Sequence, residues 1–209
     1  MALVDARYKF LFVDVGCYGR VADGGVFNSS SLSAAIESGN VLQLPTDCKL
    51  PGSDTVCPYV IVADDAFAMR RHLVKPYCNR NLTLEQRIFN YRLSRARRVV
   101  ENAFGLLCSR FRVFSKAIAL APDKVQTVVM ATCCIHNFLL RNPTSTENYL
   151  PKNSEESCSC DLQPIQSNRV NRANNMATAV RDDLCIYFNS AAGAVSWQMN
   201  AVMGCVTRQ

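Results

Sequence analysis

The sequence lacks the long apolar runs that mark secreted and membrane-spanning proteins. Its first residues, MALVDARYKF, contain no apolar run of signal-peptide length behind a basic segment. No other stretch approaches the roughly 18 apolar residues that a helix needs to span a bilayer. These absences predict a soluble, intracellular and reduced protein, so its 11 cysteines are not expected to form a disulfide framework.

The common cofactor and metal motifs are also missing. There is no internal repeat and no G-x-x-x-x-G-K phosphate loop. Neither the Cys133-Cys134 pair with His136 nor the Cys158-x-Cys160 pair has zinc-finger spacing, so buried apolar cysteine is favoured over a structural zinc. Of the two histidines, His136 is predicted to be a hydrogen-bonded core residue, while nothing in the sequence decides the role of His72.

Length and composition favour one core domain with a tail. The chain has 209 residues, of which 49% are hydrophobic, so a sizeable core can be buried. Its formal net charge is +6, and the excess is concentrated: from Arg70 to Arg112 there are eleven Lys or Arg against two Glu. A basic segment of this kind is compatible with a polyanionic partner.

Apolar patterns separated by turn residues predict strands and a helix in the first third of the chain. Residues 8–15 (YKFLFVDV) are predicted to form a buried strand, followed by a glycine-rich turn region. Asn28 or Ser29 is predicted to cap a helix that runs to about Glu37. Residues 59–63 (YVIVA) are β-branched and apolar, which predicts a second strand.

Two longer helices are predicted after these strands. Thr83, with Gln86 three residues later, forms a capping-box signature for a helix that runs to about Arg110. Its apolar residues recur at steps of three and four, which predicts a single core-facing stripe. The second helix, residues 123–140, is apolar almost all round, so it is predicted to be buried on more than one side.

Carboxylates on these elements point to phosphodiester chemistry. The strand at 59–63 leads directly to Asp64 and Asp65, and the long helix carries Glu101. Such an order of elements can bring carboxylates together at one sheet edge, where their oxygens hold two divalent ions about 3.5–4 Å apart. Two other interpretations remain open: Asp64 as a turn former, and Glu101 as a surface partner of Arg97, four residues earlier.

Several longer runs resemble one family. The runs RIFNYRLSRARRVVENAFGLLCSRFRVF, VADDAFAM and LVDARYKFLFVDVGCYGRVADGGVFNSSSL are similar to the DDE domain of Harbinger transposases and the nucleases derived from them. The run CCIHNFLL extends the resemblance, which covers residues 2–142 nearly continuously. It implies an α/β, ribonuclease-H-like mixed sheet with flanking helices, and a metal-dependent DNA endonuclease that uses Mg²⁺ or Mn²⁺.

The resemblance also implies roles for individual residues. Asp64 and Glu101 match the family's second and third catalytic acids, and Asp23, just before the VF turn, matches a metal ligand. For Asp23, a turn residue beside Gly24 remains the alternative. The basic residues expected to contact DNA phosphates are Arg92, Arg95 and Arg98.

The family's first catalytic Asp is expected upstream of the segment that matches Ala2, and neither Asp5 nor Asp14 matches it. The chain is therefore interpreted as missing its N-terminal strand and a helical DNA-binding region. This leaves a second hypothesis open, in which the chain is a catalytically inactive DNA-binding or protein-interaction remnant. Absence of the first Asp predicts weak metal binding and poor cleavage.

Resemblance, composition and spacing together predict the organisation of the chain. The resemblance implies that residues 1–142 form a partial DDE endonuclease domain. The polar composition of residues 143–175 predicts a disordered linker, and helical spacing predicts a short C-terminal helical element in residues 176–209. The lack of a long apolar run predicts no membrane partner. The family implies DNA as substrate, a separate Myb-like DNA-binding partner protein, and a nuclear location with the cytoplasm as a second one.

Overall fold

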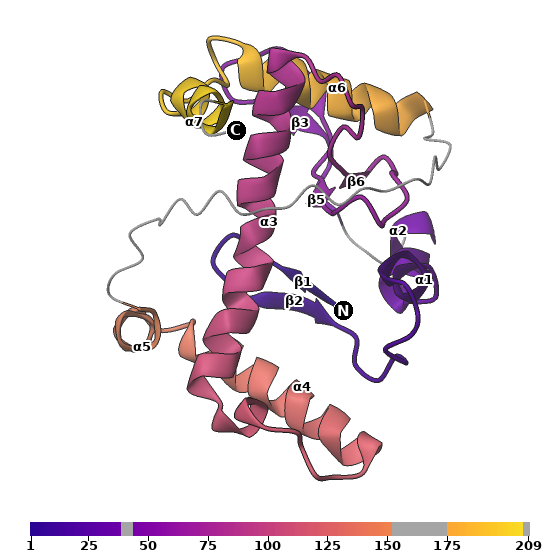
Figure 1. Ribbon diagram of the computed structural model, residues 1–209, viewed down its shortest axis with the longest axis vertical. Coiled ribbons are helices and arrows are strands. Elements are labelled where there is room, and N and C mark those ends of the chain that lie inside the picture. Colours follow the sequence, from indigo (N-terminus) through magenta and orange to yellow (C-terminus); the bar gives the residue numbers. More distant parts are fainter. Residues whose placement is uncertain (39–43, 152–174, 207–209) are drawn as a thin grey trace. The chain divides into compact units, whose positions relative to one another are not determined.

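A computed structural model describes residues 1–38, 44–151 and 175–206 of the chain (Figure 1). These residues divide into two compact units, one with residues 1–22 and 98–151 and the other with residues 23–38, 44–97 and 175–206. Short strands and longer helices occur in both, so the predicted mixed α/β class is confirmed. The strands among the described residues form three separate two-stranded ladders, and the ribonuclease-H-like sheet stays a prediction.

Helix α3 (Leu84–Arg110) begins at the predicted capping box. The Thr83 N–H donates to Gln86 Oε1 at 3.2 Å, and the Gln86 N–H donates to Thr83 Oγ1 at 3.3 Å. These two bonds satisfy backbone donors that the first turn of a helix leaves without partners, which fixes the start of α3 at this point. The prediction of a long helix ending at Arg110 is confirmed.

The first unit is built on an antiparallel strand pair and helix α4. Phe10 of β2 is buried with Ala103, Leu107 and Cys133 in one hydrophobic core. The side chain of Asn137 bonds both backbone groups of Phe10, accepting from its N–H at 2.9 Å and donating to its carbonyl at 2.8 Å. The elements are β1 (Ala2–Val4), β2 (Phe10–Val13), η1 (Arg112–Ser115), α4 (Pro122–Leu139) and α5 (Pro143–Tyr149).

His136 of α4 is fully buried and joins three parts of this unit. Its Nε2 lies 2.7 Å from the Tyr8 carbonyl oxygen and its Nδ1 lies 2.7 Å from the Tyr149 hydroxyl. Because a carbonyl only accepts, Nε2 carries the hydrogen and Nδ1 accepts from Tyr149. Tyr8 has a φ of 67°, a conformation rare for a residue with a side chain, so the bond from His136 helps to hold that turn. The prediction of a hydrogen-bonded core histidine is confirmed.

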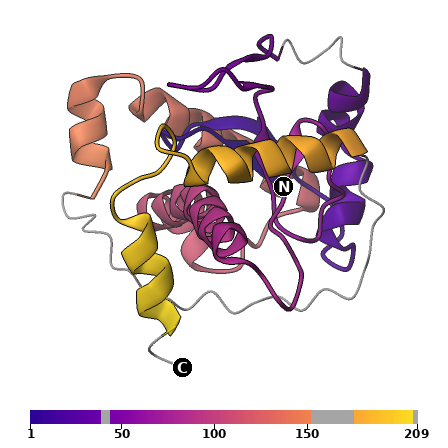
Figure 2. The ribbon, with the colours of Figure 1, turned by 90° about the horizontal axis from the view of Figure 1, so that it is seen from above.

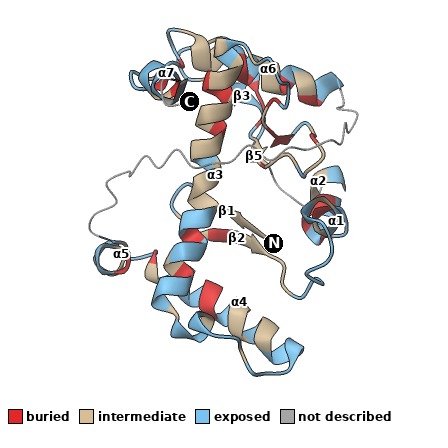
Figure 3. Cartoon of the chain, in the orientation of Figure 1, coloured by how far each residue is buried: buried red, intermediate tan, exposed pale blue. Residues whose placement is uncertain are grey.

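The predicted burial of α4 on more than one side is wrong. Its buried residues, Thr132, Cys133 and His136, lie on one face. Ile135 and Phe138 are 48% and 69% exposed. Figure 3 shows that α4 carries exposed positions as well as buried ones. An apolar side chain gains free energy only where another surface removes it from water, and in the described part of the chain the core contacts one face of α4.

The second unit has its core between α6, the start of α3 and two short ladders. Phe89 and Val74 are completely buried there, together with Val180 and Leu184 of α6. In Figures 1 and 2, α6 lies beside the N-terminal half of α3. The elements are α1 (Asp23–Asn28), α2 (Ser31–Ser38), β3 (Cys48–Lys49), β4 (Val56–Cys57), β5 (Ile61–Val62), β6 (Leu73–Val74), α6 (Asn175–Asn189) and α7 (Gln198–Val206).

Two local differences from the predictions concern the segments that connect these elements. The glycine-rich turn region contains a short helix, α1, and the following helix is capped by Ser30, whose Oγ accepts from the Ser33 N–H at 3.2 Å. Asn28 and Ser29 are therefore not the cap. In the C-terminal segment, α7 follows α6 as a separate helix. Gly193, between the two helices, packs closely on the end of α6, since a Cβ there would lie 2.1 Å from the Tyr187 carbonyl oxygen.

The predicted linker, residues 143–175, includes helix α5 and the first residue of α6. The predicted disorder of residues 152–174 lies outside the described residues, as do residues 39–43 and 207–209. None of the helices in the described part of the chain has both the length and the apolarity needed to cross a bilayer.

The environment of His136 predicts a pH-dependent stability. Burial lowers the pKa of His136 below its ordinary value of 6.5. The neutral ring is therefore favoured by folding, and its stabilisation is complete above about pH 6.5 and lost as the pH falls through the lower folded-state pKa. We expect the urea midpoint to decrease between about pH 7.5 and pH 5.5, with about 1.4 kcal/mol for each unit of pKa difference.

The two histidines of the chain provide the control. A His136→Gln protein should be less stable at neutral pH but should show little change in midpoint over this pH range. A His72→Gln protein should retain the full pH dependence. A wild-type dependence that survives His136→Gln would show that another group is responsible.

Candidate functional site

Asp64 stands immediately after a parallel strand pair. Ile61 and Val62 of β5 pair in register with Leu73 and Val74 of β6, and the Ala63 N–H still donates to the Val74 carbonyl at 2.9 Å. The backbone turns at the next residue. The carboxylate of Asp64 is therefore placed at the carboxyl end of β5, as predicted from the apolar run that precedes it.

The two oxygens of the Asp64 carboxylate have different surroundings. Oδ1 accepts the Ala66 N–H at 2.9 Å, which closes the turn after β5. Oδ2 lies 3.6 Å from Arg97 Nη2, beyond hydrogen-bond length but within the range of an ion pair. The turn-forming interpretation of Asp64 is thus correct for one oxygen, and the other faces a cationic group. Carboxylate oxygens in this position suit a hard divalent cation.

Asp23 is brought against the same turn by close packing of α1. Asp23 is the first residue of α1 and is exposed. A Cβ on the next residue, Gly24, would lie 2.5 Å from the carbonyl oxygen of Ala66. The ring of Phe27 meets that of Phe67 edge-on at 5.4 Å. The start of α1 and the turn that follows Asp64 are therefore neighbours, although the two segments are about 40 residues apart in sequence.

The carboxylate of Asp65 takes part in hydrogen bonds that stabilise the fold. Its Oδ1 accepts from Lys75 Nζ at 2.9 Å and from the Cys78 thiol at 2.7 Å, and Lys75 also donates to the Asp65 carbonyl at 3.3 Å. Lys75 and Asp65 are both largely buried. Breaking a buried pair of this kind typically costs about 3–5 kcal/mol. Burial and the bond to Asp65 raise the pKa of the Cys78 thiol to about 11, so this thiol is a donor and not a nucleophile at neutral pH.

Glu101 lies on α3 and is exposed. The alternative that it pairs with Arg97 is not observed, because the ion-pair partner of Arg97 in the described part of the chain is Asp64. Glu101 belongs to the unit of residues 1–22 and 98–151, whereas Asp23 and Asp64 belong to the other. Among the described residues no three His, Cys, Asp or Glu side chains form a group that could hold a metal, so the three-carboxylate set stays a prediction.

Two of the three arginines predicted to contact DNA touch the C-terminal segment, residues 175–206. Arg92 donates to the Gly193 carbonyl at 2.6 Å and lies 3.9 Å over the ring of Phe188. Burial lowers the pKa of Arg92. Arg95 lies 4.3 Å over the ring of Trp197. Contacts of a cation with an aromatic ring contribute about 0.5–2 kcal/mol, so these side chains stabilise the packing of the C-terminal segment on α3.

Sequence reasoning missed this role of the C-terminal segment. Arg92 and Arg95 are three residues apart and so share a face of α3, and Trp197 is the chain's one tryptophan. The single tryptophan, and the two arginines on one face of α3, were the signals that the sequence offered. Neither indicated that the two would meet, because they are about 100 residues apart in sequence.

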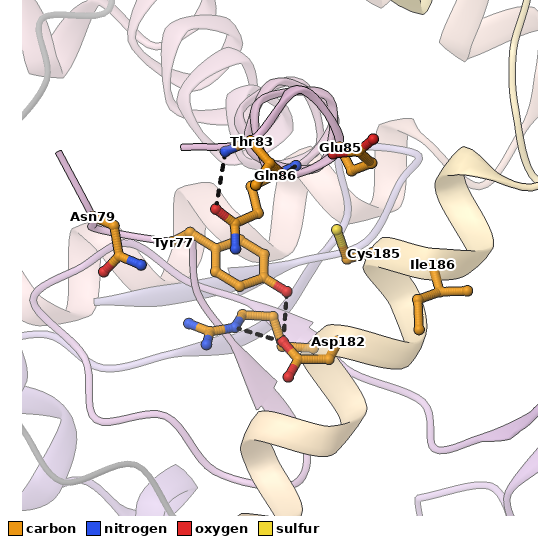
Figure 4. A pocket seen from close by; sticks show the side chains of 9 residues that line it. Tyr77, Asn79, Thr83, Glu85, Gln86, Asp182, Cys185 and Ile186 are labelled. Atoms are coloured by element: carbon orange, nitrogen blue, oxygen red, sulfur yellow. Dashed lines mark hydrogen bonds and ion pairs between the residues drawn. The ribbon is translucent and has the colours of Figure 1, made fainter. Parts of the chain in front are cut away.

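A separate polar pocket of about 410 Å³ lies at the start of α3 (Figure 4). The Tyr77 hydroxyl donates to Asp182 Oδ1 at 2.6 Å, and the Arg181 guanidinium lies 3.9 Å over the Tyr77 ring. Burial raises the pKa of Tyr77, so its hydroxyl remains a donor. The lining includes neither Asp23 nor Asp64, and we interpret these contacts as anchoring α6 on the core.

Comparison with known proteins identifies the family. Residues 1–137 match the family described as DDE superfamily endonuclease. The chain belongs to this family. The matched region contains Asp23, Asp64 and Glu101, whereas α6 and α7 lie beyond it.

Individual relatives agree with this assignment. The chain is 30% identical over 142 residues to "Protein ALP1-like" of Arabidopsis thaliana, covering 66% of this chain and 34% of that protein. It is 30% identical over 145 residues to "Putative nuclease HARBI1" of Homo sapiens, covering 68% of this chain and 37% of that protein. The chain thus spans little more than a third of the length of these relatives. No solved structure matches.

The contact between α1 and the turn after Asp64 predicts that Gly24 is required for local packing. A Gly24→Ala protein should be less stable by about 1–3 kcal/mol, because the added methyl group meets a backbone oxygen that cannot move aside without displacing the turn. The free energy of unfolding, measured by urea denaturation, reports the effect.

Gly19 offers a matched control, since a Cβ there meets nothing within 4 Å. Gly19→Ala should therefore change stability little. Equal losses from the two substitutions would contradict the close approach of α1 to the turn.

Proposed function

We propose that this chain carries part of a metal-dependent DNA endonuclease of Harbinger type, with a ribonuclease-H-like fold. Asp64 and Glu101 are the proposed catalytic carboxylates, and Asp23 is the proposed third ligand. The observation that carries the proposal is the placement of Asp64 at the end of β5 with one carboxylate oxygen free of hydrogen bonds from the described residues and facing a cationic group.

The donor set fits a hard divalent cation such as Mg²⁺ or Mn²⁺, which prefers carboxylate oxygens. When bound, such ions activate a water molecule and stabilise the leaving oxygen of a phosphodiester. The residues of this chain fix the positions of the carboxylates that would bind the ion. The bond from the Ala66 N–H fixes the Asp64 carboxylate, and the contact of Gly24 with Ala66 sets Asp23 beside the same turn.

Arg97 supplies positive charge beside Asp64 before any ion is bound. Its guanidinium and the Asp64 carboxylate are both partly buried, so their attraction is less screened than that of an exposed pair. The arginine offsets part of the cost of placing a carboxylate there. It holds the side chain of Asp64 toward α3.

DNA is the proposed substrate, and basic residues of α3 are the proposed phosphate contacts. Arg98 is the strongest candidate, because Arg92 and Arg95 have aromatic partners in the C-terminal segment. A separate Myb-like DNA-binding partner and a nuclear location, with the cytoplasm as a second one, complete the proposal by analogy with the family. The alternative function, a catalytically inactive DNA-binding or protein-interaction remnant, is an outcome of the first experiment below.

Removing a proposed ligand should affect metal binding and cleavage together. We expect Asp64→Asn and Glu101→Gln each to weaken Mn²⁺ binding, measured by calorimetry, by roughly tenfold or more, since even outer partners of metal ligands contribute 10–100-fold. Both should nearly abolish whatever plasmid nicking the wild-type chain shows in Mg²⁺ or Mn²⁺, because loss of one carboxylate alters the charge and position of the ion.

The exposed Asp54, whose ion-pair partner among the described residues is Lys49, provides the control: Asp54→Asn should change neither readout. Circular dichroism verifies that each variant is folded. Unchanged Mn²⁺ binding in the Asp64→Asn protein would refute the assignment. Mn²⁺ binding that depends on Asp64 in a wild-type chain that does not nick DNA would instead support the inactive alternative.

Phosphate contact by Arg98 predicts a change in salt dependence. Arg98→Gln should weaken DNA binding across sequences and reduce the slope of log affinity against log salt by about 0.9, because one fewer phosphate is neutralised. Fluorescence anisotropy at several salt concentrations measures the slope.

Arg92→Gln should instead lower thermal stability and leave the slope nearly unchanged, since its guanidinium is held by Gly193 and Phe188. Lys124→Gln controls for loss of one positive charge elsewhere. If Arg98→Gln leaves the slope of log affinity against log salt unchanged, Arg98 does not contact a DNA phosphate.

A further inference from the structure

Two cysteines face each other across the hairpin of β3 and β4. Cys48 and Cys57 are directly opposed in the antiparallel register, followed by Lys49 opposite Val56. The Leu50 N–H donates to the Thr55 carbonyl at 2.9 Å, which closes the turn between the strands. Both cysteines are free thiols in the structure.

Opposed positions of an antiparallel pair have the spacing that a disulfide needs. Their Cα atoms are about 5.5 Å apart in a hydrogen-bonded pair and about 4.5 Å apart in a non-hydrogen-bonded pair. A disulfide joins Cα atoms about 4.4–6.8 Å apart, so either class of pair is suitable. Side chains at opposed positions also project from the same face of the ladder. Joining Cys48 to Cys57 therefore needs no change of register.

The two thiols differ in access to solvent. Cys48 is exposed, and a hydrogen bond with it raises the pKa of the Tyr59 hydroxyl. Cys57 is only 3% exposed and is part of the core with Val74 and Leu184. Burial raises the pKa of the Cys57 thiol. An oxidant in solution thus meets Cys48 first, and Cys57 is placed to react second.

We propose that Cys48 and Cys57 are an oxidative modification site that forms a reversible disulfide with a hydroperoxide as oxidant. The Cys48 thiolate attacks the peroxide oxygen, which gives a sulfenic acid and releases hydroxide. The Cys57 sulfur then attacks the Cys48 sulfur, and the sulfenic oxygen leaves as water. In total, two thiols lose two electrons and two protons, and hydrogen peroxide becomes two molecules of water. A dithiol reductant reverses the change.

Among the residues that the structure describes, the other cysteines lack this arrangement or offer a different partner. Cys133 and Cys134 are adjacent on α4, with the first buried and the second exposed, so their side chains project from different sides of the helix. Cys185 of α6 lies in the same core as Cys57 and is the competing partner. It is buried, whereas Cys48 is exposed, so an oxidant in solution reaches Cys48 more readily.

The disulfide would close the loop between β3 and β4, and the turn of this hairpin is already held against α6 and the residues that follow it. The Tyr187 hydroxyl donates to the Pro51 carbonyl at 2.8 Å, and a Cβ on Gly52 would lie 3.2 Å from the Cβ of Ala192. The hairpin is thus held in place when reduced. Oxidation then acts mainly on the unfolded chain, whose entropy it lowers. The proposal does not depend on the proposed nuclease function.

Peptide mapping tests the pairing directly. The folded chain is treated with a small excess of hydrogen peroxide, remaining thiols are alkylated, and the chain is digested with trypsin without reductant. Cleavage after Lys49 and Arg70 places the two cysteines in separate peptides, residues 21–49 and 50–70. We expect these peptides to remain joined, two hydrogen atoms lighter than their sum, and to separate with dithiothreitol.

Thermal unfolding gives a second readout. The oxidised chain should melt ~5 °C above the reduced chain, since a short closed loop restricts the unfolded state. Cys48→Ser should abolish both the linked peptide and the shift, whereas Cys185→Ser should retain both. Because Cys48 is exposed, its replacement is not expected to unfold the chain.

Three results would overturn the proposal. One is a Cys57 to Cys185 linkage in the folded wild-type chain. Another is a Cys48 that proceeds to sulfinic acid while Cys57 remains a free thiol. The third is linkage at the same rate in urea as in buffer, because the native register would then not be what brings the thiols together.

Discussion

The apolar stripe of α3 is the constraint around which both hydrophobic cores form. Phe89 and Leu93 contribute to the core that includes α6, while Ala103 and Leu107 contribute to the core that includes Phe10. A single continuous helix therefore supplies both compact units. A polar substitution along the stripe would bury a group without a hydrogen-bond partner, which costs about 1–3 kcal/mol. The start of this helix is fixed independently by its capping box.

The basic residues of α3 serve more than one purpose. A sequence count treats them as one positive surface, yet Arg92 packs on Phe188, Arg95 on Trp197, and Arg97 pairs with Asp64. Arginine suits such positions because its planar guanidinium stacks on aromatic rings and is weakly hydrated. The charge available for a polyanion is therefore smaller than the sequence indicates, and it depends on which side of α3 the C-terminal helices occupy.

The surroundings of Asp64 show how one residue combines structural and chemical roles. A carboxylate at a strand end commonly closes a turn, and Asp64 does so through Oδ1. Because a carboxylate has two oxygens, this leaves Oδ2 for a cation. The adjacent Asp65 has both its backbone carbonyl and its carboxylate engaged by Lys75. The adjacent residues Asp64 and Asp65 thus have different roles. The difference follows from the geometry of the strand that precedes them.

The sequence by itself determined the local structure: the capping box of α3, the strand before Asp64, the helical pattern of α4 and α6, and the family to which residues 1–137 belong. These features depend on contacts between residues close together in the sequence, or on sequence motifs that can be recognised without knowledge of the fold. Only the tertiary structure decided that Gly24 packs on Ala66, that Cys48 opposes Cys57, that α4 leaves Phe138 exposed, and that Trp197 covers Arg95. Periodicity states which residues share a face but not which surface covers it, because that depends on where distant segments of the chain come to lie.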